Sequence, residues 1–390
     1  MAVLSRAVRG KKIASGKNLI LIVVGQLGLG GTERHLAQVV PELVQKGFEL
    51  KIYTLSPGGE IAEELSTRGI ELLGKNFAGP RILKLPLVSF HLAMTWWKLR
   101  PAIVHYFLPE AYLLGGAISF ISPHAKLLMS RRSLNYYQKK WPSSRFFERL
   151  LHRKMRKILA NSKAVHQQLV TEGVASSKLR LIYNGVAVAA DSGRERASFR
   201  DDIRVPERSA LIVVIANLIP YKGHLDLLKA LALLRETYQC SSWHLLVVGR
   251  DSGIQISLEE FAEQAEIHKH ITWFGPSRDV IRVLNAADIA VLPSHEEGLS
   301  NFVLEAMAAG LPSVVTNVGG NGEAIVDQQT GFVVAPRSPH ELAEKLALLV
   351  RDEALRQRLG QAAHDRARRH FSIENCVAEY AQLYDGLLLS

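Results

Sequence analysis

Cysteine is almost absent from this chain of 390 residues, which contains only Cys240 and Cys376. The two lie far apart and in no metal-ligand spacing, which excludes a disulfide framework or a structural zinc and is typical of a reducing compartment. Long hydrophobic runs are also missing: the apolar run at 19–24 has only the length of a strand, and nothing approaches the ~18 residues of a membrane span. Residues 1–17 are basic, but no apolar core follows them. We therefore predict a cytoplasmic protein without a signal peptide.

Acidic residues are scarce in the first half of the chain. Residues 1–186 contain 28 lysines and arginines against 10 acidic residues, whereas residues 187–390 contain 20 against 27, and together they give the net charge of +11. A basic half joined to a mildly acidic half indicates that the first half meets something anionic. The candidates are a membrane surface, a phosphate-bearing acceptor or a nucleic acid. No recognisable nucleic-acid-binding module occurs, so we expect no nucleic-acid partner.

Apolar, β-branched runs alternate with longer segments of helical period, a pattern typical of parallel α/β units. Strands are predicted at 19–24, 50–55, 102–107, 126–129, 158–160, 211–216, 245–248, 271–274, 289–292, 313–316 and 332–334. Helices are predicted at 32–46, 87–99, 110–121, 144–156, 163–172, 224–238, 257–267, 278–286, 302–309, 339–350 and 373–388. The pattern lapses at 187–208, which we interpret as a linker between two doubly wound domains. Ligands of such sheets bind beyond the carboxyl ends of the strands, so the chemistry should lie where the loops of both domains face each other.

The loop after the first predicted strand contains Gly28, Gly30 and Gly31 before a helix. Adjacent glycines let a ligand approach the backbone, and the start of the helix favours anions. The loop is not a G-x-G-x-x-G motif, so a plain glycine turn explains it equally well.

The most informative stretch is 293–307, where a strand end is followed by a polar loop and a helix. Ser300 or Asn301 can cap this helix, whose free amides suit a diphosphate. Glu297 precedes the helix and Glu305 lies one turn inside it, so both can accept hydrogen bonds from hydroxyls of one ligand. Alternatively, Glu305 simply complements the positive helix start.

This stretch resembles the E-x7-E signature of the retaining GT-B-fold glycosyltransferases of family 4 (glycosyl transferases group 1). The resemblance extends from Gly30 to the C-terminal helix and includes further short matches in the same order. These matches are 160–162, 183–186, 221–224, 248–250, 274–275, 319–323 and 330–332.

The resemblance implies a set of roles. Lys222 would pair with the donor diphosphate, Glu305 would bind the ribose hydroxyls, and Glu297 would bind a hydroxyl of the transferred sugar. The donor would also meet Gly30, Gly31, Asn217, Arg250, Gly298, Leu299, Ser300 and Asn301. No Asp-x-Asp triplet occurs, which agrees with a metal-independent reaction, and no cofactor is expected.

Two departures from the family pattern concern catalysis. Members often carry a His-x-His pair after the fourth strand, but here His105 is followed by Tyr106 and Phe107. An arginine is usual five residues before the phosphate lysine, and here that position is Asn217. His105 is a catalytic candidate, although a histidine at the end of a buried strand is more often a core residue.

Acceptor-side candidates come from the basic half. Arg131 and Arg132 follow a predicted strand end and are expected to line the cleft, and His35 flanks the first glycine loop. The basic residues at 145, 149, 153 and 156 share one helix face, which fits anionic lipid, a phosphorylated glycan or plain solvent. The apolar helix at 87–99 fits either a bilayer surface or the protein core.

The predicted organisation has four parts: an acceptor-binding domain at 1–186, a linker at 187–208, a donor-binding domain at 209–372 and a C-terminal helix at 373–390 that crosses back to the first domain. We predict transfer, with retention, from a nucleoside diphosphate sugar to a hydroxyl of a glycan or lipid-linked acceptor. A UDP-sugar is slightly favoured, and the role is in envelope polysaccharide or glycolipid synthesis, including lipopolysaccharide, at the inner membrane face. The alternative is a non-catalytic sugar-nucleotide scaffold or sensor, since Phe107 and Asn217 replace polar and charged groups.

Overall fold

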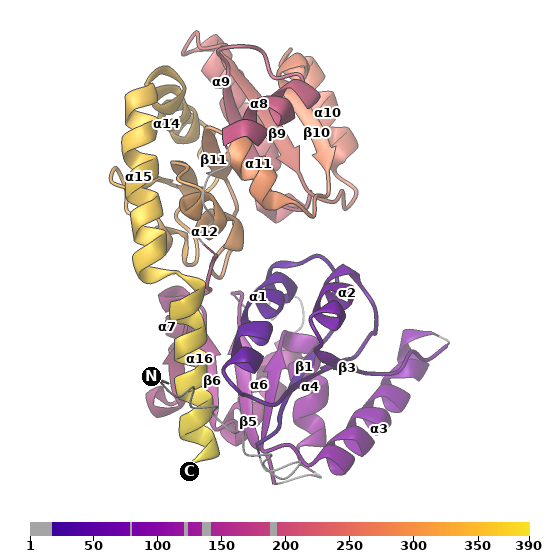
Figure 1. Ribbon diagram of the computed structural model, residues 1–390. Helices are drawn as coiled ribbons and strands as arrows, with labels where there is room; N and C mark the ends of the chain where they lie inside the picture. The colour runs from indigo at the N-terminus through magenta and orange to yellow at the C-terminus, as the bar shows by residue number, and fades with distance from the viewer. Residues whose placement is uncertain (1–17, 79, 121–123, 135–141, 188–192) are drawn as a thin grey trace, which may run out of the picture.

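The computed structural model describes residues 18–78, 80–120, 124–134, 142–187 and 193–390. Two domains are visible in Figure 1, and each has a parallel β-sheet with helices on both faces. This arrangement confirms the predicted α/β class with two Rossmann-like domains.

The first sheet has seven parallel strands in the order β3-β2-β1-β4-β5-β6-β7. Their bounds are Ile20–Val24 (β1), Leu50–Thr54 (β2), Glu71–Leu73 (β3), Ile103–Phe107 (β4), Lys126–Arg131 (β5), Lys157–Ala160 (β6) and Leu179–Leu181 (β7). All five residues of β1 are buried, because helices cover both faces of the sheet.

Alternate strand residues pack into two separate cores. Ile20 and Ile22 belong to a cluster with α1 (Gly31–Gln45), α2 (Glu60–Thr67) and α16 (Ile373–Leu388). Leu21 and Val23 belong to a second cluster on the opposite face. The helices there are α3 (Arg81–Leu99), α4 (Pro109–Ile118), α6 (Pro142–Lys154) and α7 (Lys163–Thr171).

The second sheet has six parallel strands in the order β10-β9-β8-β11-β12-β13. They are Ala210–Ile215 (β8), Trp243–Val248 (β9), Ile271–Gly275 (β10), Ile289–Leu292 (β11), Ser313–Thr316 (β12) and Gly331–Val334 (β13). The helices around it are α8 (Gly193–Asp202), α9 (His224–Glu236), α10 (Gln255–Gln264), α11 (Val280–Ala286), α12 (Asn301–Ala308), α13 (Asn321–Ala324), α14 (Pro339–Arg351) and α15 (Glu353–His370).

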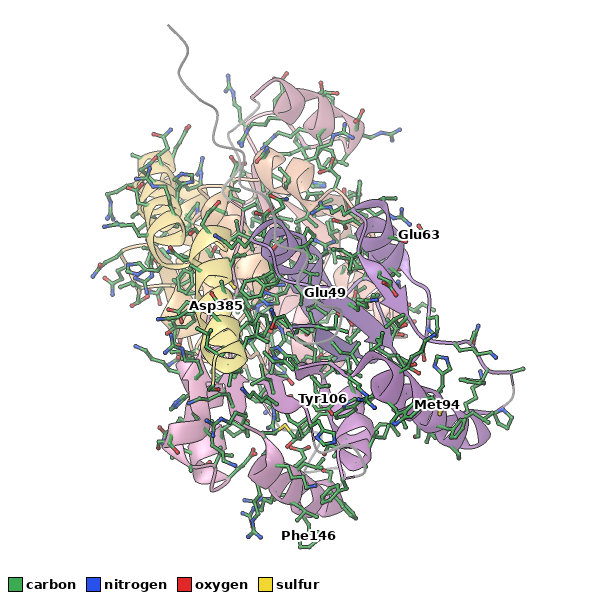
Figure 2. All side chains as sticks on the ribbon, turned by 60° about the horizontal axis from the view of Figure 1, so that its bottom comes forward. Glu49, Glu63, Met94, Tyr106, Phe146 and Asp385 are labelled. Atoms are coloured by element: carbon green, nitrogen blue, oxygen red, sulfur yellow. The ribbon has the colours of Figure 1, made fainter. Side chains whose placement is uncertain are left out.

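The C-terminal helix α16 packs against the first domain, although α15, directly before it, belongs to the second. In Figure 1 the two helices run down one side of the molecule. Tyr380 and Tyr384 of α16 are buried in the core beneath α1. Figure 2 shows Asp385 of α16 on the side of the first domain away from Met94 of α3.

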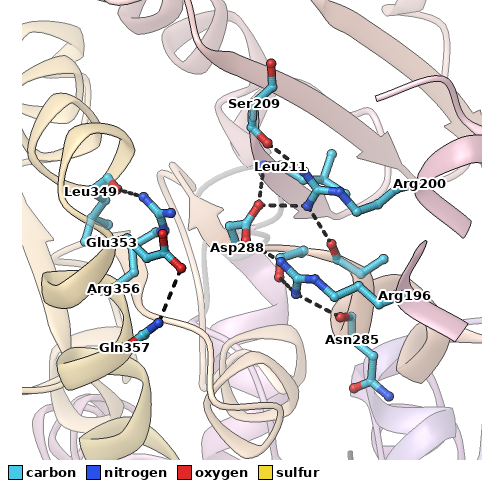
Figure 3. Close-up of polar contacts among 12 residues, drawn as sticks. Arg196, Arg200, Ser209, Leu211, Asn285, Asp288, Leu349, Glu353, Arg356 and Gln357 are labelled. Carbon is cyan, nitrogen blue, oxygen red and sulfur yellow. Dashed lines mark hydrogen bonds and ion pairs between the residues drawn. The ribbon is translucent and has the colours of Figure 1, made fainter. Parts of the chain in front are cut away.

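The predicted linker at 187–208 is wrong for most of its described length, because α8 occupies 193–202. Phe199 is buried in the second domain's core, and two arginines of α8 bind the carboxylate of Asp288 (Figure 3). Asp288 also accepts a hydrogen bond of 2.7 Å from the Leu211 amide, so it ties α8 to the start of β8. The charged sequence of α8 reflects this ion-pair network. Residues 188–192 lie outside the described residues.

Five further elements were not predicted: β3, β7, α2, α13 and α15. The two strands have only three residues each and lie at the edges of the first sheet, so they lack the apolar run of a central strand. The long helix α15 is mostly polar and buries a narrow stripe of small residues, among them Gly360, Ala363 and Ala367. Among the described residues, no helix combines the length and the apolar character needed to cross a membrane.

Replacing Asp288 should destabilise the second domain. Burial would raise the pKa of this carboxyl, but hydrogen bonds from Arg200 and Leu211 and the charge of Arg196 hold it below its ordinary value. The stabilisation is therefore present at neutral pH and is lost as the pH falls below the unfolded-state pKa of about 4. We expect Asp288→Asn to lower the free energy of unfolding by about 2–4 kcal/mol at pH 7, measured by urea denaturation.

The matched control is Asp202→Asn, which breaks an exposed ion pair with Arg282. Such pairs contribute about 0–1 kcal/mol. Equal effects of the two substitutions would contradict the role assigned to Asp288.

Candidate active site

The loops at the carboxyl ends of both sheets line one cleft of about 530 Å³ between the domains. Twelve residues proposed from the sequence lie on its wall: Gly30, Gly31, Arg132, Asn217, Lys222, Arg250, Glu297, Gly298, Leu299, Ser300, Asn301 and Glu305. Each lies in a loop or helix start that directly follows a strand, since parallel strands end at a common edge.

Glu297 and Lys222 form an ion pair at the second domain's side of the cleft. The distance from Lys222 Nζ to Glu297 Oε1 is 2.6 Å, and both side chains are largely buried. Lys222 ends a short turn after β8, and Gly223 follows in the left-handed conformation with φ of 74°. A Cβ at Gly223 would lie 2.0 Å from the Pro293 carbonyl, so glycine is required where this turn meets the loop after β11.

Helix α12 begins in the cleft. Ser300 caps it by accepting a hydrogen bond from the Val303 amide, which leaves other first-turn amides free to point at a ligand. The positive end of the helix therefore faces the cleft wall that carries Lys222, and the two together favour an anion.

Glu305 lies inside α12 on the face that meets the first domain. Burial raises the pKa of its carboxyl to about 7, and the positive charge of Arg34 opposes this increase without cancelling it. Arg34 extends from α1 across the cleft and donates a hydrogen bond of 3.0 Å to the Ser277 carbonyl. The carboxyl of Glu305 is thus poised to change its ionisation near neutral pH.

Side-chain amides join the two domains beside the glycine loop. Asn301 Nδ2 donates to the Gly31 carbonyl at 2.7 Å, and Asn184 Nδ2 donates to Asn301 Oδ1 at 2.7 Å. On the neighbouring loop, a Cβ at Gly298 would lie 2.2 Å from the Arg132 carbonyl. The domains therefore meet at backbone contact distance, and only glycine fits at position 298.

Arg132 is the cation that the first domain brings to this contact. It is half-buried in the cleft wall, and its guanidinium donates a hydrogen bond to the Tyr380 hydroxyl of α16. On the other wall, Asn217 does not supply a charge, but its Oδ1 accepts a hydrogen bond from the Arg250 amide at 3.2 Å. The Arg250 guanidinium lies 3.8 Å from Glu60 of α2. The cleft thus contains cations from both domains.

The prediction that Arg131 lines the cleft is wrong. Its side chain is buried on the opposite side of the β5 end, where it pairs with Glu148 at 2.6 Å and with Glu172 at 3.5 Å. Alternation along β5 explains this result, because adjacent residues point to opposite faces. Glu148, His152 and Glu172 are close enough to hold a metal ion, but the Arg131 guanidinium already binds both carboxylates.

His105 does not reach the cleft, contrary to its proposed catalytic role. It is fully buried, with its Nδ1 atom 2.8 Å from the Tyr384 hydroxyl and its Nε2 atom 2.9 Å from Ser130. Burial and the charge of Arg132 lower its pKa to about 3, so the ring is neutral. Phe107 is buried against His105 with ring centroids 4.4 Å apart, so it too lies in the core.

His35 is likewise buried in the core and not exposed to an acceptor. Its Nε2 atom lies 3.3 Å from the Tyr380 hydroxyl, and burial lowers its pKa well below the ordinary value. A histidine within a helix that covers a sheet points inward when its position falls on the apolar face, as here beside the core residues Leu36 and Val39.

Several cleft residues were not assigned a role from the sequence. Arg34 stands three residues after Gly31, and Asn161 and Asn184 follow the ends of β6 and β7. For the two asparagines, a polar residue within three positions of a strand end was the available signal, whereas Arg34 lies inside α1. Glu323, by contrast, is structural: its carboxylate accepts hydrogen bonds from the Lys163 and Ala164 amides at 2.8 and 2.9 Å and so caps α7 from the other domain.

Comparison with known proteins gives the same picture. The family model described as "Glycosyltransferase Family 4" matches residues 29–190, and the model described as "Glycosyl transferases group 1" matches residues 195–366. The D-inositol 3-phosphate glycosyltransferase of Corynebacterium glutamicum is 26% identical over 388 residues, which covers 92% of each chain. An N,N'-diacetylbacillosaminyl-diphospho-undecaprenol alpha-1,3-N-acetylgalactosaminyltransferase of Campylobacter jejuni is 31% identical over 183 residues, 47% of this chain and 46% of the relative. The crystal structure of HepE from Anabaena in complex with UDP-glucose superposes with a TM-score of 0.83 at 19% identity, covering 94% of this chain and 99% of that one.

Two Rossmann-like domains that face each other across a ligand cleft define the GT-B class of glycosyltransferases, which use nucleotide sugars. Within that class, the chain belongs to glycosyltransferase family 4, and the two family models together match nearly all of it.

The raised pKa of Glu305 leads to a pH-dependent stability difference. Its carboxyl is protonated in the folded protein below about pH 7 but ionises near pH 4–5 when unfolded. The folded state is therefore destabilised as the pH rises through this window. Between pH 5 and pH 8 the free energy of unfolding of the native chain should fall by about 2 kcal/mol, a decrease that Glu305→Gln should not show. Urea denaturation of both chains at the two pH values measures this difference.

Exposed Glu236 on α9 provides the control. The free energy of unfolding of Glu236→Gln should differ from that of the native chain by the same amount at both pH values. If the difference in the free energy of unfolding between Glu305→Gln and the native chain were also the same at both pH values, the carboxyl of Glu305 would already be ionised at pH 5.

Proposed function

We propose that the chain transfers a sugar, with retention at the anomeric carbon, from a nucleoside diphosphate sugar to a hydroxyl of a glycan or lipid-linked acceptor. The observation that carries this proposal is the convergence of Lys222, Glu297, Glu305 and the start of α12 in one cleft. Such a reaction requires a cation and amides that bind the diphosphate, and carboxylates that accept hydrogen bonds from sugar hydroxyls. It also requires a facing wall from the other domain.

The donor fits the second domain. Free amides at the start of α12 would hold the distal phosphate, and Lys222 would exchange its contact with Glu297 for one with the diphosphate. In its ionised form Glu305 would accept hydrogen bonds from the ribose, while Glu297 would hold a hydroxyl of the transferred sugar. A uracil base is favoured by the bound UDP-glucose of the HepE structure.

Catalysis would rest on stabilising the departing diphosphate as the sugar takes on oxocarbenium character. Lys222 and Arg132 would supply the charge from opposite walls, with no metal ion. Arg132 would thus compensate for Asn217, which stands where relatives carry an arginine. The buried position of Phe107 removes one reason to regard the chain as a non-catalytic sensor, because a side chain outside the cleft does not impair it.

The first domain, residues 1–186, would bind the acceptor, and residues 209–372 would bind the donor. An acceptor carrying phosphate suits the basic first domain. The names of the two relatives include a phosphorylated inositol and a diphospho-undecaprenol, which supports an anionic acceptor. We therefore favour a lipid-linked envelope glycan.

A thermal-shift screen tests the donor assignment. UDP-sugars at about 100 times their dissociation constant should stabilise the chain by about 2.7 kcal/mol, more than GDP-, ADP- or dTDP-sugars at equal concentration. Lys222→Ala should abolish the shift, whereas Lys229→Ala, an exposed lysine on α9, should preserve it. No shift with any nucleotide sugar would overturn the donor site, and a product with inverted anomeric configuration, observed by NMR, would overturn retention.

Kinetics of Arg132→Gln test the second cation. If Arg132 stabilises the leaving diphosphate mainly in the transition state, kcat should fall about 30-fold or more while the KM for the donor changes little. Arg180→Gln, an exposed arginine of the same domain, should leave both constants unchanged. An unchanged kcat for Arg132→Gln would assign the catalytic charge to Lys222 alone.

A further inference from the structure

Large apolar side chains are exposed over one face of the first domain, formed by α3, the end of α4 and α6. Phe90 is 68% exposed, Trp97 66% and Phe146 71%. More than half of the exposed large apolar side chains among the described residues gather here: Leu85, Leu87, Phe90, Met94, Trp97, Phe120, Phe146, Phe147 and Leu150. We call these nine residues the apolar face.

The three helices are neighbours, because α4 packs against α3 on one side and against α6 on the other. Figure 2 shows Met94 and Phe146 at the outer margin of the domain. Monomeric proteins rarely expose apolar side chains in such number on one face, and where they do, the face is an interaction site.

In α3, the exposed apolar side chains are not the ones that core packing needs. Val88, Leu92 and Trp96 pack into the core, and they alone provide the apolar stripe that a surface helix needs. Leu87, Phe90, Met94 and Trp97 form a second stripe at intervals of three and four residues on the outer side.

The charge around the apolar face has one sign. Residues 84–100 contain no acidic residue, and the single acid of α6, Glu148, is buried against Arg131. The exposed cations are Lys98, Arg100, Arg145, Arg149, Arg153, Lys154 and Arg156. Lys154 lies with its Nζ atom 3.5 Å from the centre of the Phe120 ring, so cations and aromatic rings are interleaved.

We propose that the apolar face docks on an anionic lipid bilayer, with the aromatic side chains at the boundary of headgroups and acyl chains and the cations among the phosphates. Aromatic residues beside lysine and arginine are the composition that lies flat in this interface. A protein partner would have to match a surface of one charge that spreads over three helices. This inference deepens the proposed function, because it places the acceptor-binding domain on the surface where a lipid-linked acceptor resides.

Sedimentation of the full chain with unilamellar vesicles tests the docking surface. The native chain should bind vesicles of phosphatidylcholine with about 30% phosphatidylglycerol at least tenfold more tightly than phosphatidylcholine alone, and salt should weaken the binding. The double substitution Phe146→Ser, Phe147→Ser should reduce binding to the anionic vesicles at least tenfold, as should Trp97→Ser together with Phe90→Ser.

The matched control is Ile256→Ser with Ile281→Ser, two exposed isoleucines on the second domain, which should leave vesicle binding unchanged. Because all substituted side chains are exposed, melting temperatures should stay at the native value. Transfer to a water-soluble acceptor should also be unchanged in every variant, so a failed docking surface is distinguishable from a failed proposed function.

Three results would overturn the proposal: no vesicle binding by the native chain, equal binding by native and Phe146→Ser, Phe147→Ser chains, or equal binding to neutral and anionic vesicles. A dimer in analytical ultracentrifugation that dissociates in the Phe146→Ser, Phe147→Ser chain would also overturn it, since a second copy would then cover the apolar face.

Discussion

The contact between the start of α12 and the first domain is the constraint on which the cleft depends. Asn301 bridges Gly31 of one domain and Asn184 near the domain junction, and Gly298 lies against the Arg132 carbonyl. Because the same few residues begin α12 and touch the opposite wall, the geometry of the cleft cannot vary independently of the contact between domains.

The helix α16 packs against the residues of the first domain that form this contact. Its Tyr380 accepts a hydrogen bond from Arg132 and lies beside His35, while Tyr384 binds His105. The histidines suggested by the sequence as catalytic or acceptor-binding are therefore part of a buried polar layer. That layer connects the C-terminal helix to Arg132 of the cleft wall.

The central strands and most helices were predictable, because buried parallel strands have apolar runs that few other structures share. The sequence also predicted that Glu297, Glu305 and Lys222 lie in the cleft, since each follows a strand end in a recognisable motif. The short edge strands β3 and β7, the polar helix α15 and the charged helix α8 were not predictable. Their apolar content is too small to mark them, and they form because the rest of the domain offers partners, as Asp288 does for α8.

The sequence by itself determined the α/β class, the two-domain organisation, the family and the residues that line the second domain's side of the cleft, because those features depend on local periodicity and on motifs within a few residues. Only the tertiary structure decided that Arg132 and not Arg131 faces the cleft, that His35 and His105 are buried, and that Glu323 caps a helix of the other domain. The reason is physical: the direction of a side chain and the partner of a charge depend on which surfaces pack together, and those surfaces lie up to 345 residues apart in the chain, as His35 and Tyr380 do.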